Sequence, residues 1–240
     1  MKTTASKKDS PSEKKEEKPH YSGHRARLKQ RFLNNGASAL ADYELVELLL
    51  FLAIPRKDVK PLAKTLLQKF GSVSALLSAH KDELLAIDGL SENAVSALKT
   101  VQAVMHKSMQ EEIHRKPILN SWSRLLDYCN TTMIHEKKEN FRVLFLNKKN
   151  ELITDEIQHT GTVDHTPAYP REVMKRALEV GATAIILVHN HPSGDPEPSR
   201  ADIDVTNQII EAGRPLNVIV HDHIIVARGG SVSLKNEGYI

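Results

Sequence analysis

The sequence has little cysteine and no long hydrophobic run. Cys129 is the single cysteine among 240 residues, so neither a disulfide within the chain nor a cysteine-based zinc site can form. No apolar stretch reaches the ~18 residues that a membrane span needs, and the N-terminus lacks the apolar core of a signal peptide. The composition therefore predicts a soluble, cytoplasmic protein without a membrane partner.

The chain also lacks a strong excess of charge. It carries 33 basic and 30 acidic side chains, a formal charge of +3, and this balance does not by itself indicate a nucleic-acid or membrane partner. The excess is largely local, because residues 1–20 contain six lysines, four acidic residues and almost no apolar residues. We predict that residues 1–21 form a disordered tail.

Residues 22–116 show helical periodicity and no strand-like alternation. Leu45, Leu48, Leu49 and Leu52 repeat at helical spacing after a possible cap at Asp42. A second helix is predicted from Val59 to Phe70, with Gly71 as its stop. Shorter apolar patterns follow at Leu84–Ile87 and Ala94–Met105. The pattern predicts a small all-α domain over residues 22–116.

The apolar period changes after Pro117. An amphipathic helix is predicted first, and β-rich runs then alternate with helices that end at glycines. The predicted helices are Trp122–Met133, Arg171–Val180 and Arg200–Ala212, and the predicted strands are Phe141–Leu146, Glu151–Ile157, Thr183–Val188, Val218–Val226 and a short one near Ser231. Residues 117–240 are therefore expected to form a mixed α/β domain.

Candidate metal ligands stand at the end of the strand that precedes His189. Residues two apart on a strand point the same way, so His189 and His191 can bind one ion while Asn190 faces the other side. The turn-rich loop 192–198 can return the start of the next helix to these imidazoles, which makes Asp202 a third ligand. Two histidines and one carboxylate leave a tetrahedral position open, so the pattern predicts a catalytic Zn²⁺ site.

The spacing His189-x-His191, seven residues, Ser199, two residues, Asp202 resembles the motif of JAMM (MPN+) metalloproteases. The wider sequence His-Asn-His-Pro-Ser-Gly, Glu-Pro-Ser and Asp resembles the RadC-like branch of that family, as do Pro170-Arg171-Glu172 and Asp222-His223. The resemblance implies a JAMM-type three-layer α/β domain with a mixed sheet. It also implies hydrolysis of peptide or isopeptide bonds in a protein or peptide substrate.

The same resemblance implies further catalytic residues. The family uses an acid that does not bind the metal, placed at the start of an upstream strand, and Glu139 occupies that place. Glu172 is the second candidate for this general base. Ser199 corresponds to the family's serine, which steadies the developing oxyanion, although Ser199-x-x-Asp202 is equally a capping box for the following helix.

A second histidine pair, His221-Asp222-His223, lacks a downstream Ser and Asp at the family spacing. We interpret this pair as structural and expect His223 to be a buried residue that forms hydrogen bonds.

The all-α domain suggests a function of another class. Residues 87–94 resemble a helix-hairpin-helix, whose turn can hold a DNA phosphate, although Ser91 replaces the usual second glycine and a plain helix connection explains the segment too. The nearby basic residues are either DNA contacts or a solvated helix face: His24, Arg25, Arg27, Lys29 and Arg31. The alternative function is a DNA-associated repair or recombination accessory protein with a structural or vestigial metal site.

Overall fold

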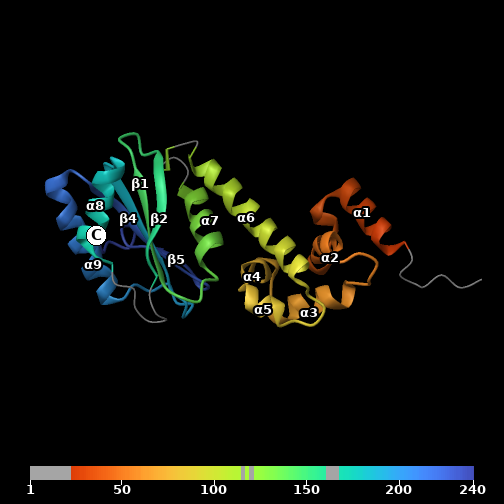
Figure 1. Ribbon diagram of the computed structural model, residues 1–240. Helices are drawn as coiled ribbons and strands as arrows, with labels where there is room; N and C mark the ends of the chain where they lie inside the picture. The colour runs from red at the N-terminus through yellow and green to blue at the C-terminus, as the bar shows by residue number, and fades with distance from the viewer. Residues whose placement is uncertain (1–22, 115–116, 119–121, 161–167) are drawn as a thin grey trace, which may run out of the picture.

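The computed structural model describes residues 23–114, 117–118, 122–160 and 168–240. The predicted tail, residues 1–21, lies outside this range. The N-terminal region is entirely helical and the C-terminal region combines helices with a five-stranded sheet, which confirms the predicted fold class (Figure 1). Among the described residues, no helix combines the length and the apolar character that a membrane crossing demands.

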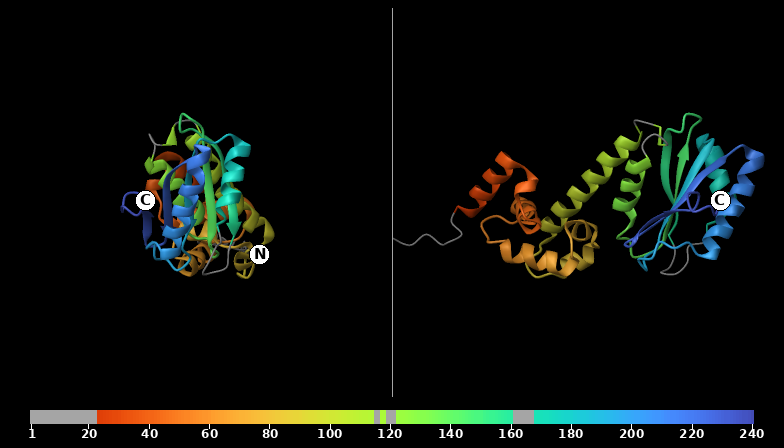
Figure 2. Two further views of the ribbon diagram at one scale, coloured as in Figure 1. Left: turned by 90° about the vertical axis from the view of Figure 1, so that its left-hand side faces the viewer. Right: turned by 180° about the vertical axis from the view of Figure 1, so that it is seen from behind.

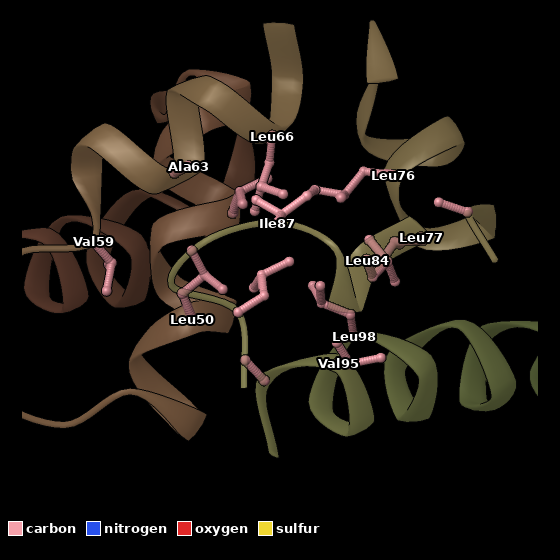
Figure 3. Packing of buried hydrophobic residues seen from close by; sticks show 14 of the residues in the cluster. Leu50, Val59, Ala63, Leu66, Leu76, Leu77, Leu84, Ile87, Val95 and Leu98 are labelled. Carbon is pink, nitrogen blue, oxygen red and sulfur yellow. The ribbon is translucent and has the colours of Figure 1, made fainter. Parts of the chain in front are cut away.

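The N-terminal region consists of short helices around one apolar core (Figure 3). Leu50, Leu66, Leu76 and Leu98 are essentially inaccessible to solvent within it. The helices are α1 (His24–Asn35), α2 (Asp42–Ala53), α3 (Lys60–Phe70), α4 (Val73–Ser78), α5 (Lys81–Leu85) and α6 (Glu92–His114), with a 3-10 turn at Ala37–Ala39.

Two details of this region differ from the sequence interpretation. Asp42 is the first residue of α2, and the N-terminal cap is provided by Glu44, whose carboxylate accepts a hydrogen bond from the Ala41 amide at 3.0 Å. Leu76 and Leu77 belong to the separate short helix α4, which Ser72 caps by accepting from the Ala75 amide at 3.1 Å. A helix of six residues is too short for its periodicity to be recognised in sequence.

Helix α6 connects the two regions and extends beyond its apolar pattern, which ends at Met105. It runs from the helical core to the α/β region (Figures 1 and 2). Near its end, Ile113 packs in the apolar cluster that also contains Leu125 of α7 (Trp122–Met133). Because both ends of α6 are packed, the helix fixes one region against the other.

The C-terminal sheet has the strand order β2-β1-β3-β4-β5. β1 pairs antiparallel with both β2 and β3, β3 and β4 are parallel, and β5 is antiparallel to β4, so the sheet is mixed as predicted. The strands are β1 (Asn140–Leu146), β2 (Leu152–Thr160), β3 (Ala184–Asn190), β4 (Ile219–Ala227) and β5 (Gly230–Ser233).

Helices cover both faces of this sheet. Alternate residues of β1 face opposite sides, with Leu144 packing in the cluster under α7 and Val143 in the cluster under α8 (Pro170–Val180) and α9 (Arg200–Gly213). Figure 1 shows α7 on one side of the sheet and α8 and α9 on the other. The domain therefore has three layers, and its central strand β3 is buried along all seven residues.

Gly181 and Gly213 both stand at the C-terminal end of a helix, but glycine is required at the two positions for different reasons. Gly181 ends α8 in the left-handed conformation, with a φ of 70°. Gly213 is the last residue of α9 and has ordinary helical geometry, with a φ of −76°. A Cβ atom there would lie 2.4 Å from the Val218 carbonyl oxygen, so Gly213 permits close packing of α9 against the segment that enters β4.

Candidate metal centre

The strand β3 carries two of the three predicted ligands. His189 is 1 % exposed and lies on the sheet face that packs against α8 and α9. His191 follows the end of β3, where its amide donates to the Val226 carbonyl at 2.9 Å. The side chains of His189 and His191 converge, with their Nε2 atoms 2.8 Å apart. The two-residue spacing therefore places both imidazoles on one side, as predicted.

Asp202 reaches the same point from the first turn of α9. Its Oδ1 lies 3.3 Å from His189 Nε2, and its Oδ2 lies 3.6 Å from His191 Nε2. The helix start is held by Ser199, whose amide and hydroxyl donate to Asp202 Oδ2 at 2.7 and 2.6 Å. The capping box thus fixes the carboxylate in front of the two imidazoles.

These three side chains fit a zinc ion by geometry and by donor type. Their ligand atoms all lie within 4.8 Å of one another. Two nitrogens on one tetrahedral zinc, each about 2.0–2.1 Å from the metal, are separated by roughly 3.3 Å. The observed separations are close to this value, so small side-chain rotations suffice to accommodate the ion.

Hydrogen bonds around His189 decide which of its ring nitrogens carries a proton. Thr206 donates its hydroxyl proton to the Asp202 carbonyl, so its oxygen accepts from His223 Nδ1 at 2.6 Å. The neutral His223 then has an unprotonated Nε2, which accepts from His189 Nδ1 at 2.8 Å. Consequently His189 Nε2 carries a lone pair directed at the ligand cluster.

His191 is fixed in the same tautomer by a different partner. Its Nδ1 lies 2.8 Å from the Asp195 carbonyl, which can only accept, so Nδ1 holds the proton and Nε2 the lone pair. In their neutral forms, His189 and His191 therefore direct two lone pairs at one point next to a carboxylate. Such an arrangement is repulsive unless a cation or a proton occupies that point.

Burial and charge set the protonation states of the cluster. Burial lowers the pKa of His189 to about 4, with the neighbouring His191 adding to the effect, and burial also lowers the pKa of His223. The hydrogen bond with Asp202 raises the pKa of His191. Burial opposes ionisation of Asp202, but hydrogen bonding to His191 and Ser199 lowers its pKa below the usual value. His189 is therefore neutral and Asp202 is charged, which are the states in which these two groups bind metal.

Glu139 stands at the opposite strand, immediately before β1. Phe141 pairs with His189 in the antiparallel register, so two further residues set Glu139 opposite His191. Consistent with this position, the Glu139 charge raises the pKa of His191. Glu139 is half-buried and supplies no atom to the three-ligand cluster.

The segment that leads to Glu139 is fixed by Asn190. The Asn190 side chain accepts from the Asn140 amide at 2.8 Å and donates to the carbonyls of Lys138 and Glu136 at 3.1 and 3.4 Å. The residue between the two histidines thus faces the other side of the sheet, as predicted. There it holds the backbone on both sides of Glu139.

The remaining predicted residues occupy different settings. Ser199 is exposed at the cap of α9, with its hydroxyl on Asp202, and this contact is compatible with both roles inferred from the sequence. Glu172 lies in the first turn of α8, where it pairs with Arg171 at 3.2 Å. In the described part of the chain, Glu172 contacts Arg171 and not the histidine cluster, whereas the charge of Glu139 acts on His191.

Two residues that support the candidate ligands were not recognised in this role from the sequence. Thr206 is one helical turn after Asp202, a spacing that places both on one face of α9. His223 is buried and forms hydrogen bonds as expected, but its partner is the candidate ligand His189. The pairing of β3 with β4 brings them together, and periodicity alone does not predict which strands pair. Phe141 adds an apolar wall, with its ring centroid 5.6 Å from that of His223.

The helical region contains the segment that resembles a helix-hairpin-helix. Gly89 adopts a φ of 91° in the turn, and Ser91 caps α6 by accepting from the Ala94 amide at 3.4 Å. Ile87 and Leu90 are buried in the helical core. These contacts form a complete helix connection.

The basic cluster on α1 is largely engaged within the protein. His24 lies 2.8 Å from the buried Glu47, and Arg31 pairs with Glu44. Arg25 donates to the Ile54 and Lys57 carbonyls, both at 2.6 Å, while its guanidinium stacks on Phe51. Three members of the cluster therefore attach α1 to its neighbours.

Comparison with known families matches both parts of the chain. Residues 23–96 match the UPF0758 N-terminal domain, and residues 119–239 match the RadC-like JAB domain. The second match covers the entire sheet and all three ligand candidates. The chain therefore belongs to the RadC-like JAB domain family.

Proposed function

We propose that this protein is a zinc-dependent hydrolase that cleaves amide bonds in a protein or peptide. The observation that carries the proposal is the pair of Nε2 lone pairs on His189 and His191, which meet 2.8 Å apart beside the Asp202 carboxylate. Two histidines and one carboxylate are a ligand set found in catalytic zinc sites, where a fourth position stays open. Family membership supports the proposal independently.

Each residue has a defined chemical task in this proposal. His189, His191 and Asp202 hold the metal, which when bound supplies a Lewis acid that activates water and polarises the amide carbonyl. The Glu139 carboxylate accepts a proton from the attacking water and returns it to the leaving amine nitrogen. The Ser199 hydroxyl, which donates to Asp202 in the structure, would turn from it to donate toward the oxyanion that develops on the carbonyl oxygen.

The number of protein ligands and the nearby Glu139 favour a catalytic site over a purely structural one. A structural zinc site is closed by four protein ligands, whereas these residues supply three. Glu139 lies opposite His191 without being part of the ligand set, so a second carboxylate stands next to the candidate ligands. A site whose only task was to stabilise the fold would not require this second carboxylate.

The decisive experiment combines metal analysis with cleavage of a peptide library. Wild-type protein is expected to contain one equivalent of zinc and to cleave peptides. Glu139→Gln should retain zinc and lose roughly 10²–10⁴-fold in cleavage rate, the usual contribution of a general base. Glu172→Gln is the matched control and should retain both. Cleavage by Glu139→Gln at the wild-type rate would refute the assignment of Glu139, and metal-free wild-type protein would refute the zinc site.

A second function, a DNA-associated accessory protein, rests on the capped turn at Gly89 and Ser91 before α6. Backbone amides at such a helix start can bind a phosphate. Salt-dependent DNA binding that is lost on deleting residues 22–115 would support it. Binding no tighter than that of an unrelated protein of equal charge would exclude it.

A further inference from the structure

A groove lined by basic side chains lies between the helical region and the α/β domain. It consists of two adjoining hollows of about 720 and 730 Å³, which share five lining residues: Lys99, Gln102, Glu136, Asn140 and Thr160. One hollow follows α6 and α7, and the other extends to α4, α5 and the segment before β1. We call these two hollows together the interdomain groove; α4, α5, α6 and α7 can be located in Figure 1.

Positive charge is concentrated in this groove. Two of its cations are paired, Lys137 with Glu83 and Arg142 with Asp155. Within the described residues, the lining contains five further cations and a single other carboxylate, that of Glu136. These cations are Lys81, Lys99, Lys107, Lys138 and Arg228. The chain as a whole carries an excess of only three positive charges, so the groove holds more than its share. Like charges gathered in a hollow repel one another and attract an anionic partner.

The groove reaches the same end of β1 and β3 as the candidate metal centre, but from the opposite face of the sheet. Asn140 and Lys138 line it, and their backbone atoms are held by Asn190. Arg228, also in the lining, donates to the Pro192 carbonyl at 3.2 Å. Asn190 and Pro192 flank His191 in the chain. A chain that leaves the groove at this end reaches the ligand cluster by passing around the segment 138–140, which carries Glu139.

The lining favours a polypeptide over a nucleic acid. Single-stranded nucleic acids bind through aromatic rings on which the bases stack. Among the described residues, Tyr128 is one of two in the groove lining with a six-membered aromatic ring; it is only 5 % exposed, and its hydroxyl is bound to Asp155. The other, Phe70, packs against the helical core. Over the part of the chain that the structure describes, the groove thus offers cations and the imidazoles of His80, His106 and His135, but no fully exposed tyrosine, phenylalanine or tryptophan ring. Gln102 and Gln110 add amide groups suited to a peptide backbone.

We propose that the interdomain groove binds an Asp- and Glu-rich segment of the substrate, next to the amide bond that is cleaved at the metal centre. The substrate role of this segment rests on the proposed function, whereas its binding does not. The groove then selects acidic protein segments by charge, and the metal centre acts on the adjoining backbone.

The binding test uses full-length Glu139→Gln protein treated with a chelator, so that neither cleavage nor metal contributes. A fluorescent peptide of alternating Asp and Gly should bind, its Asn counterpart should not, and added salt should weaken binding because the contact is electrostatic. The double variant Lys81→Glu, Lys107→Glu should weaken binding by about tenfold or more. Both lysines are exposed and distant in sequence from the candidate ligands.

The control is Lys64→Glu, Lys148→Glu, which changes the net charge equally at exposed positions outside the groove. Equal losses in the two double variants, or equal binding of the Asp and Asn peptides, would overturn the proposal. An oligonucleotide of the same charge that binds the groove more tightly than the Asp peptide would also overturn it, in favour of a nucleic acid.

Cleavage by the wild-type enzyme separates this proposal from the proposed function. If both proposals are right, Lys81→Glu, Lys107→Glu should raise KM for acidic substrates and leave kcat unchanged. The groove contact would be lost equally from the bound substrate and from the transition state. Groove-dependent binding without cleavage of any peptide would remove the hydrolase function and keep the binding site. Cleavage of acidic and neutral peptides with equal KM would remove the groove's role and keep the hydrolase.

Discussion

His189 Nδ1 lies 2.8 Å from Nε2 of His223, a residue that is not itself a candidate ligand. Together with Thr206, this contact directs the lone pair of His189 toward the ligand cluster. Hydrogen bonds of this kind orient a ligand and increase its basicity.

We therefore expect His223→Ala to weaken zinc binding by roughly 10–100-fold, the range typical of partners behind a metal ligand. Competition with a chromophoric chelator measures the affinity directly. Because a buried ring is removed, stability should also fall, so Thr206→Val serves as a conservative second variant. Thr206→Val keeps the side-chain volume but cannot accept a hydrogen bond from His223. Unchanged zinc affinity in both variants would contradict the role of His223 and Thr206 in orienting His189.

Zinc should stabilise the folded protein. A ligand that binds only the native state adds about 2.7 kcal/mol when its free concentration is 100 times its Kd. Wild-type protein should therefore unfold at a higher temperature after zinc is added, whereas His191→Ala and Asp202→Asn should not respond. Asp204→Asn, two residues further on the exposed side of α9, is the control and should behave as the wild type. A zinc response retained in Asp202→Asn would disprove its part in the site.

Asn190 links the ligand strand to the segment that carries Glu139. Asn190→Ala leaves the Asn140 amide without its partner, and an unsatisfied buried group costs about 1–3 kcal/mol in the free energy of unfolding. Glu139 would also lose its fixed position, so kcat should fall while the zinc content stays at one equivalent. Chemical denaturation, metal analysis and kinetics give the three readouts. Loss of zinc together with activity would show instead that Asn190 acts on the ligands.

Gly213 and Gly181 should differ in their tolerance of substitution. Gly213→Ala places a Cβ against the Val218 carbonyl and is expected to cost roughly 1–3 kcal/mol, as overpacking usually does. Gly181→Asn should cost little, because asparagine tolerates the left-handed conformation and no atom lies within 4 Å of the new Cβ. Urea denaturation of both variants tests the difference, and equal stability would invalidate the close-packing argument.

The sequence by itself determined the local elements and the candidate ligands. Helical and strand periodicity depend on which side chains are apolar, so β1, β3, α8 and α9 were predicted within a few residues. The two-residue spacing of His189 and His191 fixes their common direction wherever the strand lies. Short elements escaped this reasoning, as α4 shows, because their apolar patterns are brief.

Only the tertiary structure decided which residues surround the ligands. The pairing of β1 with β3 brings Glu139 opposite His191 across about fifty residues of sequence, and the pairing of β3 with β4 allows His223 to contact His189. Strand pairing depends on packing of the whole domain, so no local pattern specifies it. The interdomain groove likewise exists only because α6 packs against both regions, which gathers lysines that are scattered along the chain.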